Sequence, residues 1–520
     1  MNLGRYVSRT ALHYPNNIAL IHENKRFTYE EFEQRTNKLA HGLLGLGLGK
    51  GDGIAILSWN RAEIVEIEVA CYKAGIVRIP VNARIALPET IHVLNDSEAK
   101  AVFVGPEHMG PLLESEGALE TVKHFICFEN TPPKKLSYDA LLAGKKEESP
   151  DIEVEGDDLA VLAYSSGTTG KLKAIMQTFG NRLAAIRKLL MIPEMRIGPD
   201  TIFCHVGPIT HASGMWLMPV MFRGGCNLVL SRFDVQMFLE TIQRERVTNS
   251  IFVPAMINMI LDYTEVGHYD LSSLRGIIYG GAPTSSHKVK EAIEALGPVM
   301  IQCYGMTETT SYLNVLTAKE HVDALMNKNE QRLASCGRPF FDTEVKVVNE
   351  HGEQVSPGEM GEMIARGPDL MKGYYKEPEL TKKTIKDGWI YSGDLARIDE
   401  EGYIYVVDRI VDKIITGGFN VYPTEVEQAL YSHPSVFEAC VVGVPDDKWG
   451  EAVKAVVVLK EGFEGTTADD LIEHCKRFLG SFKKPRSIDF VDVLPKNPGG
   501  KILRREVKER YWQGKDRRVH

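Results

Sequence analysis

A loop of small, hydroxylic and basic residues is the part of this sequence best suited to chemistry. Residues 165–173 read SSGTTGKLK and follow an apolar run, 159–164, that predicts a buried strand. Glycine lets backbone N–H groups turn toward an anion, and the hydroxyl and lysine side chains add donors and positive charge. The loop therefore predicts a polyphosphate site, with an ordinary polar surface loop as the alternative. It is not a Walker A loop, because the spacing G-x-x-x-x-G-K-[ST] is absent.

Other segments offer groups that such a site needs. The glycine turn at 279–283 lets a flat ring approach the backbone closely. In the segment YGMTE at 304–308, Glu308 offers the oxygen ligand that Mg²⁺ prefers. Asp394 can accept two hydrogen bonds at once, and Lys501 lies in a glycine-rich loop. Taken singly, each has a structural alternative, such as a turn cap for Asp394 and a solvated charge for Lys501.

Together, these segments resemble the motifs of the adenylate-forming enzymes, the superfamily of acyl-CoA synthetases, luciferases and peptide-synthetase adenylation domains. The family's phosphate loop is usually [YF]-[ST]-S-G-[ST]-T-G-x-P-K-G, and here Leu172 replaces proline and Ala174 replaces glycine. Val411 stands where the family's hinge usually carries Lys or Asp, and Gly499 stands where Ser or Thr is usual. The motifs follow in the family's order along essentially the whole chain.

The resemblance implies which residues form each part of an active site; without it, His211 and Tyr304 would be interpreted as core residues. Coenzyme A would pass close to Gly417 and Gly418, and Mg²⁺ would be held by Thr168 and Glu308. The catalytic residues would be Lys501, His211, Thr307 and Glu308. The acyl pocket would be lined by His211, Ser213, Met215, Trp216, Gly281 and Cys336. The ATP site would comprise Ser165, Ser166, Gly167, Thr168, Thr169, Gly170, Lys173, Gly281, Ala282, Pro283, Gln302, Cys303, Tyr304, Gly305, Thr307, Asp394, Arg409 and Lys501.

The implied activity is that of an acyl-CoA synthetase that uses ATP, Mg²⁺ and coenzyme A. A carboxylate attacks the α-phosphorus of ATP and releases pyrophosphate, and a thiol then attacks the acyl-adenylate. Because two anions must meet in the first step, positive charge is required at the phosphate. The alternatives are an adenylating enzyme with another acceptor and a non-catalytic nucleotide-binding protein.

The acid is expected to be uncharged beyond its carboxylate and predominantly apolar. Residues 212–220, which follow His211, contain no ionisable side chain, and an unpaired buried charge is strongly unfavourable. We expect a medium- or long-chain fatty acid, with a cyclic or aromatic acid as the alternative. If the side chains of Met215, Trp216 and Cys336 make the pocket short, it would favour compact rings over long chains. An amino acid is disfavoured, because Ala212 and Ser213 offer no aspartate for an ammonium group.

The elements that must position these residues follow an α/β rhythm. Thr28 and Glu31 predict a capping box at a helix start. A strand at 53–57, a helix capped by Asn60 and a strand at 76–81 predict a parallel sheet. The segment 130–158 is rich in Lys, Glu and Pro and predicts a surface connection. Near residue 335 the period changes to two, which favours a small antiparallel barrel or sheet.

The family's fold is α/β, with a large N-terminal part of two doubly wound sheets and a small β-barrel, plus a small mobile C-terminal α+β domain. The corresponding boundaries are an AMP-binding domain at 1–409 and a mobile domain at 410–520 that carries Lys501. The periodicities agree with this division, because the elements after residue 421 are short and mix strands with helices.

Composition narrows the function classes. The 520 residues are 43% hydrophobic and 25% charged, as in an ordinary globular protein, and the net charge of −9 argues against a nucleic-acid partner. Eight scattered cysteines without C-x-x-C spacing predict buried thiols in a reducing compartment. No signal region or bilayer-length apolar run is present, so we expect a cytoplasmic enzyme without an integral membrane segment. A homodimer is left open.

Overall fold

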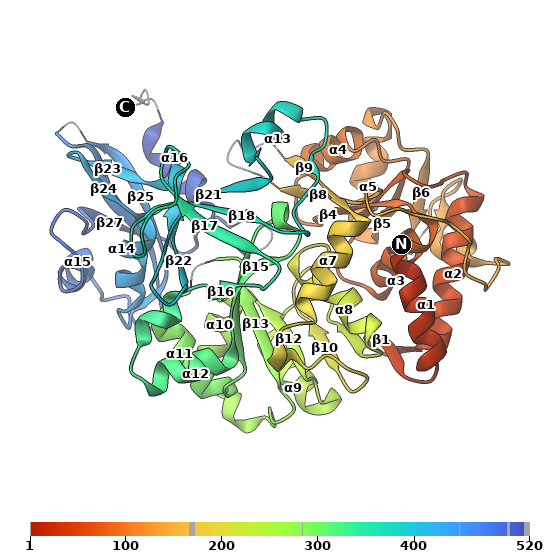
Figure 1. Ribbon diagram of the computed structural model, residues 1–520, viewed down its shortest axis with the longest axis horizontal. Coiled ribbons are helices and arrows are strands. Elements are labelled where there is room, and N and C mark those ends of the chain that lie inside the picture. The colour runs from red at the N-terminus through yellow and green to blue at the C-terminus, as the bar shows by residue number, and fades with distance from the viewer. Residues whose placement is uncertain are drawn as a thin grey trace.

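The computed structural model describes residues 2–129, 131–165, 172–282, 284–446, 448–496 and 500–513. Two large sheets form the N-terminal part, and a third sheet and a C-terminal domain follow them (Figure 1). Within the described residues the first sheet has nine strands. In spatial order they are β16 (Arg338–Pro339), β15 (Tyr312–Leu316), β14 (Met300–Gly305), β13 (Gly276–Gly280), β12 (Asn249–Phe252), β10 (Ile202–His205), β11 (Cys226–Val229), β1 (Ile18–His22) and β2 (Lys25–Thr28).

The second large sheet has eight strands in the described part of the chain. Their order is β19 (Gly373–Tyr374), β9 (Lys173–Thr178), β8 (Leu159–Ser165), β4 (Val77–Val81), β3 (Gly53–Leu57), β5 (Ala101–Val104), β6 (His124–Cys127) and β7 (Leu136–Ser137). Its central strands β3 and β4 are parallel and buried at every position. Burial on both faces explains their continuous apolar sequence and confirms the doubly wound prediction.

Helices cover both faces of these sheets (Figure 1). They are α1 (Leu3–His13), α2 (Tyr29–Gly45), α3 (Ala62–Ala74), α4 (Leu87–Asp96), α5 (Pro106–Glu114), α6 (Tyr138–Leu142), α7 (Phe179–Leu189), α8 (Leu217–Phe222), α9 (Val235–Glu245), α10 (Pro254–Leu261), α11 (Ser286–Leu296) and α12 (Ala318–Met326). The predicted capping box of α2 is present, because the Thr28 and Glu31 side chains each accept from the other's backbone N–H. All eight cysteines are buried and unpaired, as predicted.

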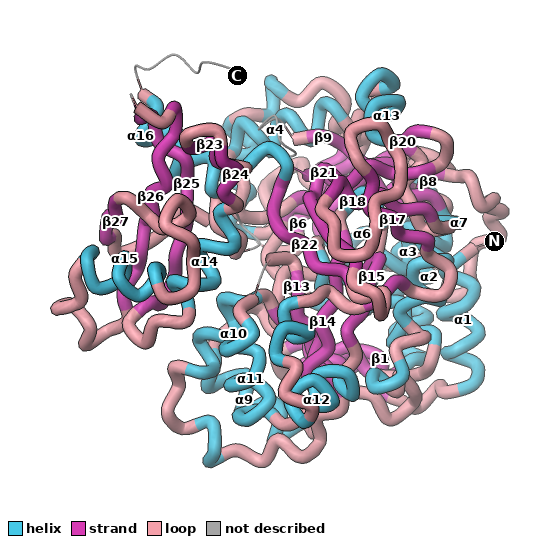
Figure 2. Tube along the Cα trace, turned by 60° about the vertical axis from the view of Figure 1, so that its left-hand side comes forward, coloured by secondary structure: helices cyan, strands magenta, loops and turns pink. Residues whose placement is uncertain are grey.

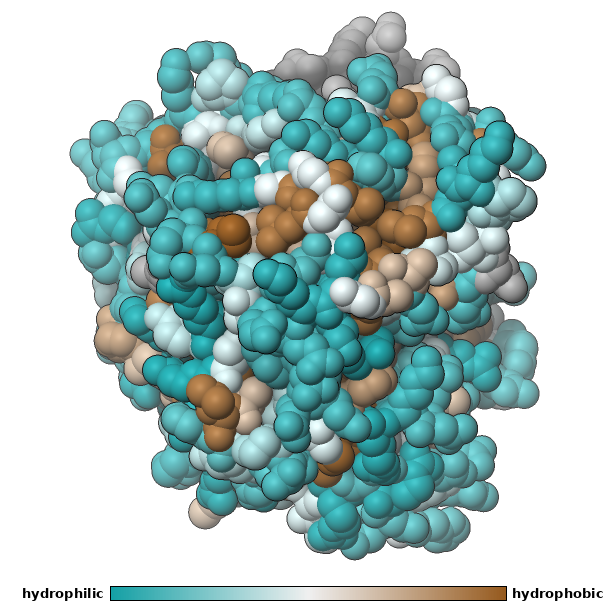
Figure 3. Space-filling view, turned by 90° about the vertical axis from the view of Figure 1, so that its right-hand side faces the viewer, coloured by the Kyte–Doolittle hydropathy of each residue, from teal (hydrophilic) through white to brown (hydrophobic). Residues whose placement is uncertain are grey.

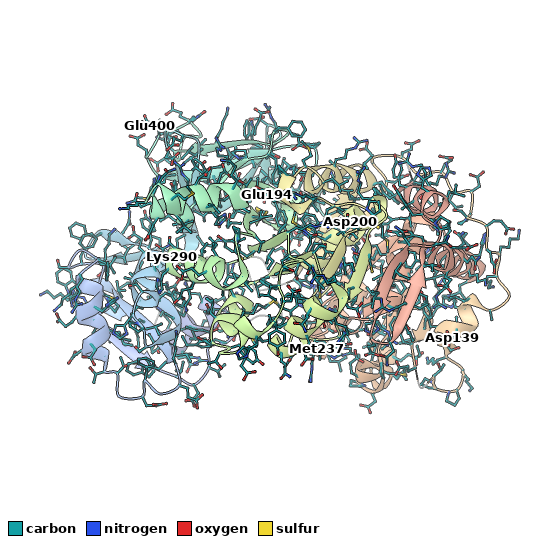
Figure 4. All side chains as sticks on the ribbon, turned by 90° about the horizontal axis from the view of Figure 1, so that it is seen from below. Asp139, Glu194, Asp200, Met237, Lys290 and Glu400 are labelled. Atoms are coloured by element: carbon teal, nitrogen blue, oxygen red, sulfur yellow. The ribbon has the colours of Figure 1, made fainter. Side chains whose placement is uncertain are left out.

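The third sheet is antiparallel and occupies the place predicted for the small barrel. Its described strands are β17 (Glu344–Val348), β18 (Gly361–Arg366), β21 (Trp389–Ile398), β20 (Ile385–Lys386) and β22 (Ile404–Arg409), and α13 (Pro378–Thr384) lies before β20. Strands β21 and β22 form a hairpin across the turn at 400–402. Seen from below, Glu400 of this turn lies at the edge of the molecule (Figure 4).

The C-terminal domain packs helices α14 (Pro423–Tyr431), α15 (Ala468–Lys476) and α16 (Arg504–Trp512) around a mixed sheet. The strands are β23 (Ile414–Thr416), β24 (Phe419–Val421), β25 (Val436–Asp446), β26 (Gly450–Leu459) and β27 (Ser487–Phe490). This domain lies beside α10 (Figure 2). Lys460 forms a 3.8 Å ion pair with Asp262 at the end of α10, and a Cβ placed on Gly500 would lie 3.7 Å from Val253 at its start. The domain therefore contacts both ends of one helix.

The prediction that 130–158 is only a surface connection is wrong. The segment contains β7 and α6, and Asp139 of α6 lies at the end of the molecule opposite the C-terminal domain (Figure 4). Tyr138 is buried, and its hydroxyl donates to the Glu66 carboxylate, which also pairs with Arg35. A buried carboxylate requires such partners, so the polar composition of the segment concealed a packing role.

Apolar residues gather in a band on the face of the N-terminal part that Figure 3 shows, between hydrophilic side chains. Among the described residues, no helix combines the length and the apolar character that crossing a bilayer would require.

The prediction that Asn60 caps a helix is also wrong, because α3 begins at Ala62 with Arg61 as its N-cap. The Asn60 amide instead donates to the carbonyls of Gly207 and Leu230, and its oxygen accepts from the Ile209 N–H. Those three backbone groups follow β10 and β11 of the first sheet, whereas Asn60 follows β3 of the second. Asn60 therefore joins the two sheets beside the segment that carries His211.

Asn60→Ala should lower the free energy of unfolding by about 1–3 kcal/mol, because three partly buried backbone groups lose their partner. Chemical denaturation monitored by tryptophan fluorescence measures this loss. Asn327→Ala is the control, because Asn327 is exposed after α12, and exposed substitutions usually stay within about 0.5 kcal/mol. Equal stability of the two variants would contradict the bridging role.

Candidate active site

The predicted phosphate loop is the connection of an antiparallel hairpin. Strands β8 and β9 pair with Ser165 opposite Lys173, so the loop leaves and re-enters the second sheet at one edge. Lys173 lines a hollow of about 350 Å³ that His92, Asp96 and Tyr375 also line. The predicted site residues Ser166, Gly167, Thr168, Thr169, Gly170 and Pro283 lie outside the described residues.

Tyr304, Asp394 and Arg409 form one connected group. The Tyr304 hydroxyl donates to one oxygen of the buried Asp394 carboxylate, and Arg409 Nε lies 2.7 Å from the other. β22 carries Arg409 opposite Asp394 on β21, so the register of the third sheet positions the ion pair. Burial raises the pKa of Tyr304, and the adjacent carboxylate raises it further. Each Asp394 oxygen keeps a second lone pair for another donor.

Gln302, Cys303 and Gly305 lie on the same strand as Tyr304, and the glycine turn after β13 lies beside them. A side chain at Gly280 would meet the Cys303 carbonyl at 2.2 Å, so the two strand ends approach closely. Gly281 has a φ of +82°, and Ala282 is half-buried. The Gln302 amide oxygen is buried and accepts no hydrogen bond from a described residue, which leaves it free for a donor such as an exocyclic amine.

Glu308 is buried and held by a residue far along the chain. Its Oε1 accepts a 2.9 Å hydrogen bond from the Tyr374 hydroxyl, while Met371 N–H donates to its backbone carbonyl. Gln177 donates to the neighbouring Thr307 carbonyl at 3.3 Å. A carboxylate with one donor fits Mg²⁺, which takes one or two carboxylates together with substrate phosphates. No cluster of three or more His, Cys, Asp or Glu side chains occurs among the described residues, and such a site does not need one.

A buried ion pair packs against residues 308–311. Lys188 Nζ of α7 lies 2.7 Å from both oxygens of Asp369, and both side chains are fully buried. The Ser311 hydroxyl donates to the same carboxylate at 2.7 Å. Between Glu308 and Ser311, Thr310 has a φ of +57°, which is strained for a β-branched residue. The surrounding hydrogen bonds therefore hold a tight turn immediately after Glu308.

Lys501 of the C-terminal domain lies within electrostatic range of Asp394 and Arg409. The charges of Arg409 and Asp394, both of the N-terminal part, act on its ammonium group. The lysine keeps solvent contact, but protein atoms surround it; this crowding, and then the charge of Arg409, lower its pKa. Lys501 and Asp394 are thus within electrostatic range although 107 positions separate them in the sequence.

The segment between the two domains is held by Arg504. Its guanidinium pairs with Asp408 at 3.4 Å, Asp412 at 3.2 Å and Glu427 at 2.7 Å. Asp408 also accepts from the N–H and hydroxyl of Thr424 in α14. One arginine, three positions after Lys501, therefore links both ends of the segment 408–412, which includes Val411, to the C-terminal domain.

Gly417 and Gly418 form the turn between β23 and β24. Gly417 has a φ of +57°, its N–H donates to the Trp449 carbonyl, and a Cβ there would lie 2.4 Å from the Trp449 ring. Gly418 has a φ of +82° and open space around its Cα. The turn therefore excludes a side chain at one glycine and presents bare backbone at the other.

His211 lies against residues that follow β4 of the second sheet. The Asn82 amide nitrogen is 3.3 Å from Nε2, and the Thr210 hydroxyl is 3.2 Å from Nδ1. Because the amide donates, Nε2 accepts, and the ring proton resides on Nδ1. Protein atoms crowd the imidazole although it keeps solvent contact; this burial, and then the charge of Arg84, lower its pKa to about 4. His211 is therefore a neutral hydrogen-bonding group near pH 7.

The segment after His211 contributes Trp216 to a buried aromatic stack. Trp216 is fully buried and stacks on Phe203 with ring centroids 5.4 Å apart, and Met215 packs at the edge of the same cluster. Ser213 points into the core, where its hydroxyl contacts His205 at 3.0 Å. Cys336 lies in a separate cluster beside Tyr304, and its thiol faces the Ile404 carbonyl. The predicted pocket residues therefore fall into two groups.

Sequence reasoning missed several residues that support the site. Tyr374 and Asp369 carry no motif, and only the pairing of β19 with β9 brings their segment to Glu308. His205 and Asn82 could have been noticed as polar residues at the ends of apolar strands, where parallel strands present their site residues.

Comparison with known proteins shows the family to which the chain belongs. The profile of the AMP-binding enzyme family matches residues 7–375, and that of the AMP-binding enzyme C-terminal domain matches residues 425–501. A feruloyl-CoA synthase from Amycolatopsis sp. is 37% identical over 98% of this chain and 99% of its own length. The medium/long-chain-fatty-acid–CoA ligase FadD8 of Mycobacterium tuberculosis is 34% identical over 97% of this chain and 89% of its own. The o-succinylbenzoate-CoA synthetase of Bacillus subtilis, solved with an acyl-adenylate, superposes with a TM-score of 0.84 at 32% identity over 97% of each chain.

The chain belongs to the AMP-binding enzyme family, in the adenylate-forming superfamily. The predicted fold class is confirmed, and so is the predicted enzyme class, an acyl-CoA synthetase that uses ATP, Mg²⁺ and coenzyme A.

The lowered pKa of His211 predicts a flat pH response. Between about pH 5.5 and 8 the imidazole stays neutral, so it contributes no titration to kcat/KM for the acid. Wild type and His211→Gln, which keeps a neutral hydrogen-bonding group, should therefore give parallel pH profiles, even where their rates differ. An inflection near pH 6.5 that disappears in the variant would contradict this result.

Proposed function

We propose that the protein is an AMP-forming CoA ligase for a cyclic or aromatic carboxylic acid. The acyl-CoA ligase class is that of the family; the choice of acid is the proposal. The observation that carries it is the buried stack of Trp216 on Phe203, immediately after His211. Rigid rings at this position would favour a compact, flat acid over a long flexible chain.

The surroundings of this stack support the same choice. The cluster that contains Trp216 also contains Tyr312 and Phe340, and Met215 packs against it. The feruloyl-CoA synthase and the o-succinylbenzoate-CoA synthetase are named for ring-containing acids, whereas FadD8 is named for fatty acids. Two ring-acid ligases among similar proteins favour the ring over the medium- or long-chain fatty acid that we expected first.

Within this proposal the described residues take the predicted roles. Tyr304, Gln302 and the turn at 280–282 would hold the adenine, and Asp394 the ribose hydroxyls. Arg409 and Lys501 would supply positive charge where the acid meets the α-phosphate. Glu308 would hold Mg²⁺, which neutralises phosphate charge when bound.

Steady-state kinetics with ATP and coenzyme A across a panel of acids tests the choice. The panel is acetate, octanoate, palmitate, benzoate, cinnamate, cyclohexanecarboxylate and phenylalanine. We expect at least one ring acid to exceed palmitate in kcat/KM by about tenfold or more, because a long chain loses more rotamer freedom on binding than a rigid ring does. A preference for palmitate would show that the substrate is a fatty acid and not a ring acid. Adenylation of ring acids without transfer to coenzyme A would indicate another acceptor.

We also propose that residues 1–409 and 410–520 are the two domains, and that the second rotates between the half-reactions. Lys501 faces Asp394 and Arg409 in the structure, whereas Gly417 and Gly418 lie in a turn of the same domain. One face of the domain would serve adenylation and the other would serve the thiol step, and the segment 408–412 would be the hinge.

Lys501→Ala should therefore separate the two half-reactions. Acid-dependent ATP–pyrophosphate exchange should fall about 10²–10³-fold, because a charge at the developing phosphorane is lost. Formation of the thioester from preformed acyl-adenylate should change little, because that step does not use Lys501. The control Lys476→Ala removes a surface lysine that pairs with Glu473 in α15, and both rates should persist. Equal loss of both half-reactions in Lys501→Ala would argue against alternation.

A further inference from the structure

The Glu308 carboxylate is held by the hydroxyl of a single tyrosine. Glu308 is 9% exposed, and its Oε1 accepts a 2.9 Å hydrogen bond from the Tyr374 hydroxyl. No other side chain of the described residues donates a hydrogen bond to this carboxylate. The bond joins two sheets, because Glu308 follows β14 of the first sheet and Tyr374 lies on β19 of the second. A contact between residues 66 positions apart therefore restrains the side chain to which we assign the metal.

Tyr374 is itself held on several sides. β19 pairs with β9, which sets Tyr374 opposite Ile175, and the Tyr374 N–H donates to the Thr381 hydroxyl of α13 at 2.9 Å. The tyrosine is 9% exposed and belongs to a buried apolar cluster. A Cβ at Gly373 would lie 2.7 Å from Thr381, so β19 and α13 are in close contact. The hydroxyl is therefore a preorganised donor, fixed to the strand that leaves the predicted phosphate loop.

A nearby cation offers the carboxylate a competing position. Arg409 lies within electrostatic range of Glu308, and it already pairs with Asp394 at 2.7 Å. A glutamate side chain has many rotamers, so a carboxylate that loses its donor is free to turn toward a neighbouring positive charge. That turn would withdraw an oxygen ligand from the metal and would neutralise an arginine assigned to the phosphate. The Tyr374 hydroxyl therefore opposes a specific alternative position of Glu308.

We propose that Tyr374 is a positioning residue that keeps the Glu308 carboxylate ready to bind the Mg²⁺ that accompanies ATP. The inference rests on the proposed function, in which Glu308 holds that ion, and it adds a residue outside the predicted site. Groups that orient the ligands of a metal are typically worth about 10–100-fold in metal affinity or activity. Because Tyr374 acts through Glu308, its effect should appear in the Mg²⁺ dependence and should vanish once Glu308 is changed.

The test measures Mg²⁺ dependence in the full-length enzyme. Isothermal titration calorimetry gives the Kd of ATP, without acid or coenzyme A, in Mg²⁺ and in EDTA. Tyr374→Phe should weaken ATP binding about tenfold in Mg²⁺ and change it by less than about twofold in EDTA. In acid-dependent ATP–pyrophosphate exchange, the Mg²⁺ concentration for half-maximal rate should rise about tenfold, and saturating Mg²⁺ should restore most of the rate.

Tyr403→Phe is the matched control. The Tyr403 hydroxyl also donates to a glutamate, Glu320, at 2.9 Å, and Tyr403 is 4% exposed. Both substitutions remove a buried hydrogen bond of the same kind, so both should lower the denaturation midpoint. Only Tyr374→Phe should shift the Mg²⁺ dependence, and equal shifts in the two variants would show a general structural effect and overturn the inference.

Glu308→Gln provides the second arm of the test. Adding Tyr374→Phe to Glu308→Gln should cause little further loss of Mg²⁺-dependent ATP binding, because residues that act as a unit are not additive. Additive losses, or an unchanged Mg²⁺ dependence in Tyr374→Phe, would overturn the inference and leave the proposed function standing. If Glu308→Gln itself keeps the wild-type Mg²⁺ dependence, the metal assignment within the proposed function fails together with the inference.

Discussion

The buried ion pair between Lys188 and Asp369 is the constraint on which the turn after Glu308 depends. Removing two charges from water is costly, and the pair is tolerated because both carboxylate oxygens and the Ser311 hydroxyl take part. Burial raises the pKa of Asp369, and the ammonium group beside it limits the rise. Through this pair, a helix against the second sheet holds the strained turn that follows Glu308 on the first sheet.

Positive charge is organised around Asp394 in a similar way. Arg409 reaches the carboxylate by strand register, whereas Lys501 arrives from a separate domain. Arg504, three positions after Lys501, forms ion pairs with Asp408, Asp412 and Glu427. These ion pairs hold the chain near Lys501 against the segment 408–412. Positive charge from two parts of the chain, the third sheet and the C-terminal domain, therefore acts on one carboxylate.

The cluster that follows His211 is built on different physics. Trp216 stacks on Phe203 there, and the other members are apolar or aromatic side chains. The group around Asp394 is therefore held by charges and hydrogen bonds, whereas the cluster around Trp216 is held by the packing of apolar and aromatic side chains.

The sequence by itself determined the family, the α/β rhythm, the antiparallel third sheet and the position of each motif, because these features depend on local periodicity and on residue types at short spacing. It did not reveal the partners of Asn60, the burial of Tyr138, the contact of Tyr374 with Glu308 or the encounter of Trp216 with Tyr312. Each of these contacts joins residues that lie 66 to 170 positions apart. Only the pairing and stacking of whole sheets brings such residues together, so the tertiary structure alone decided which polar groups are each other's partners.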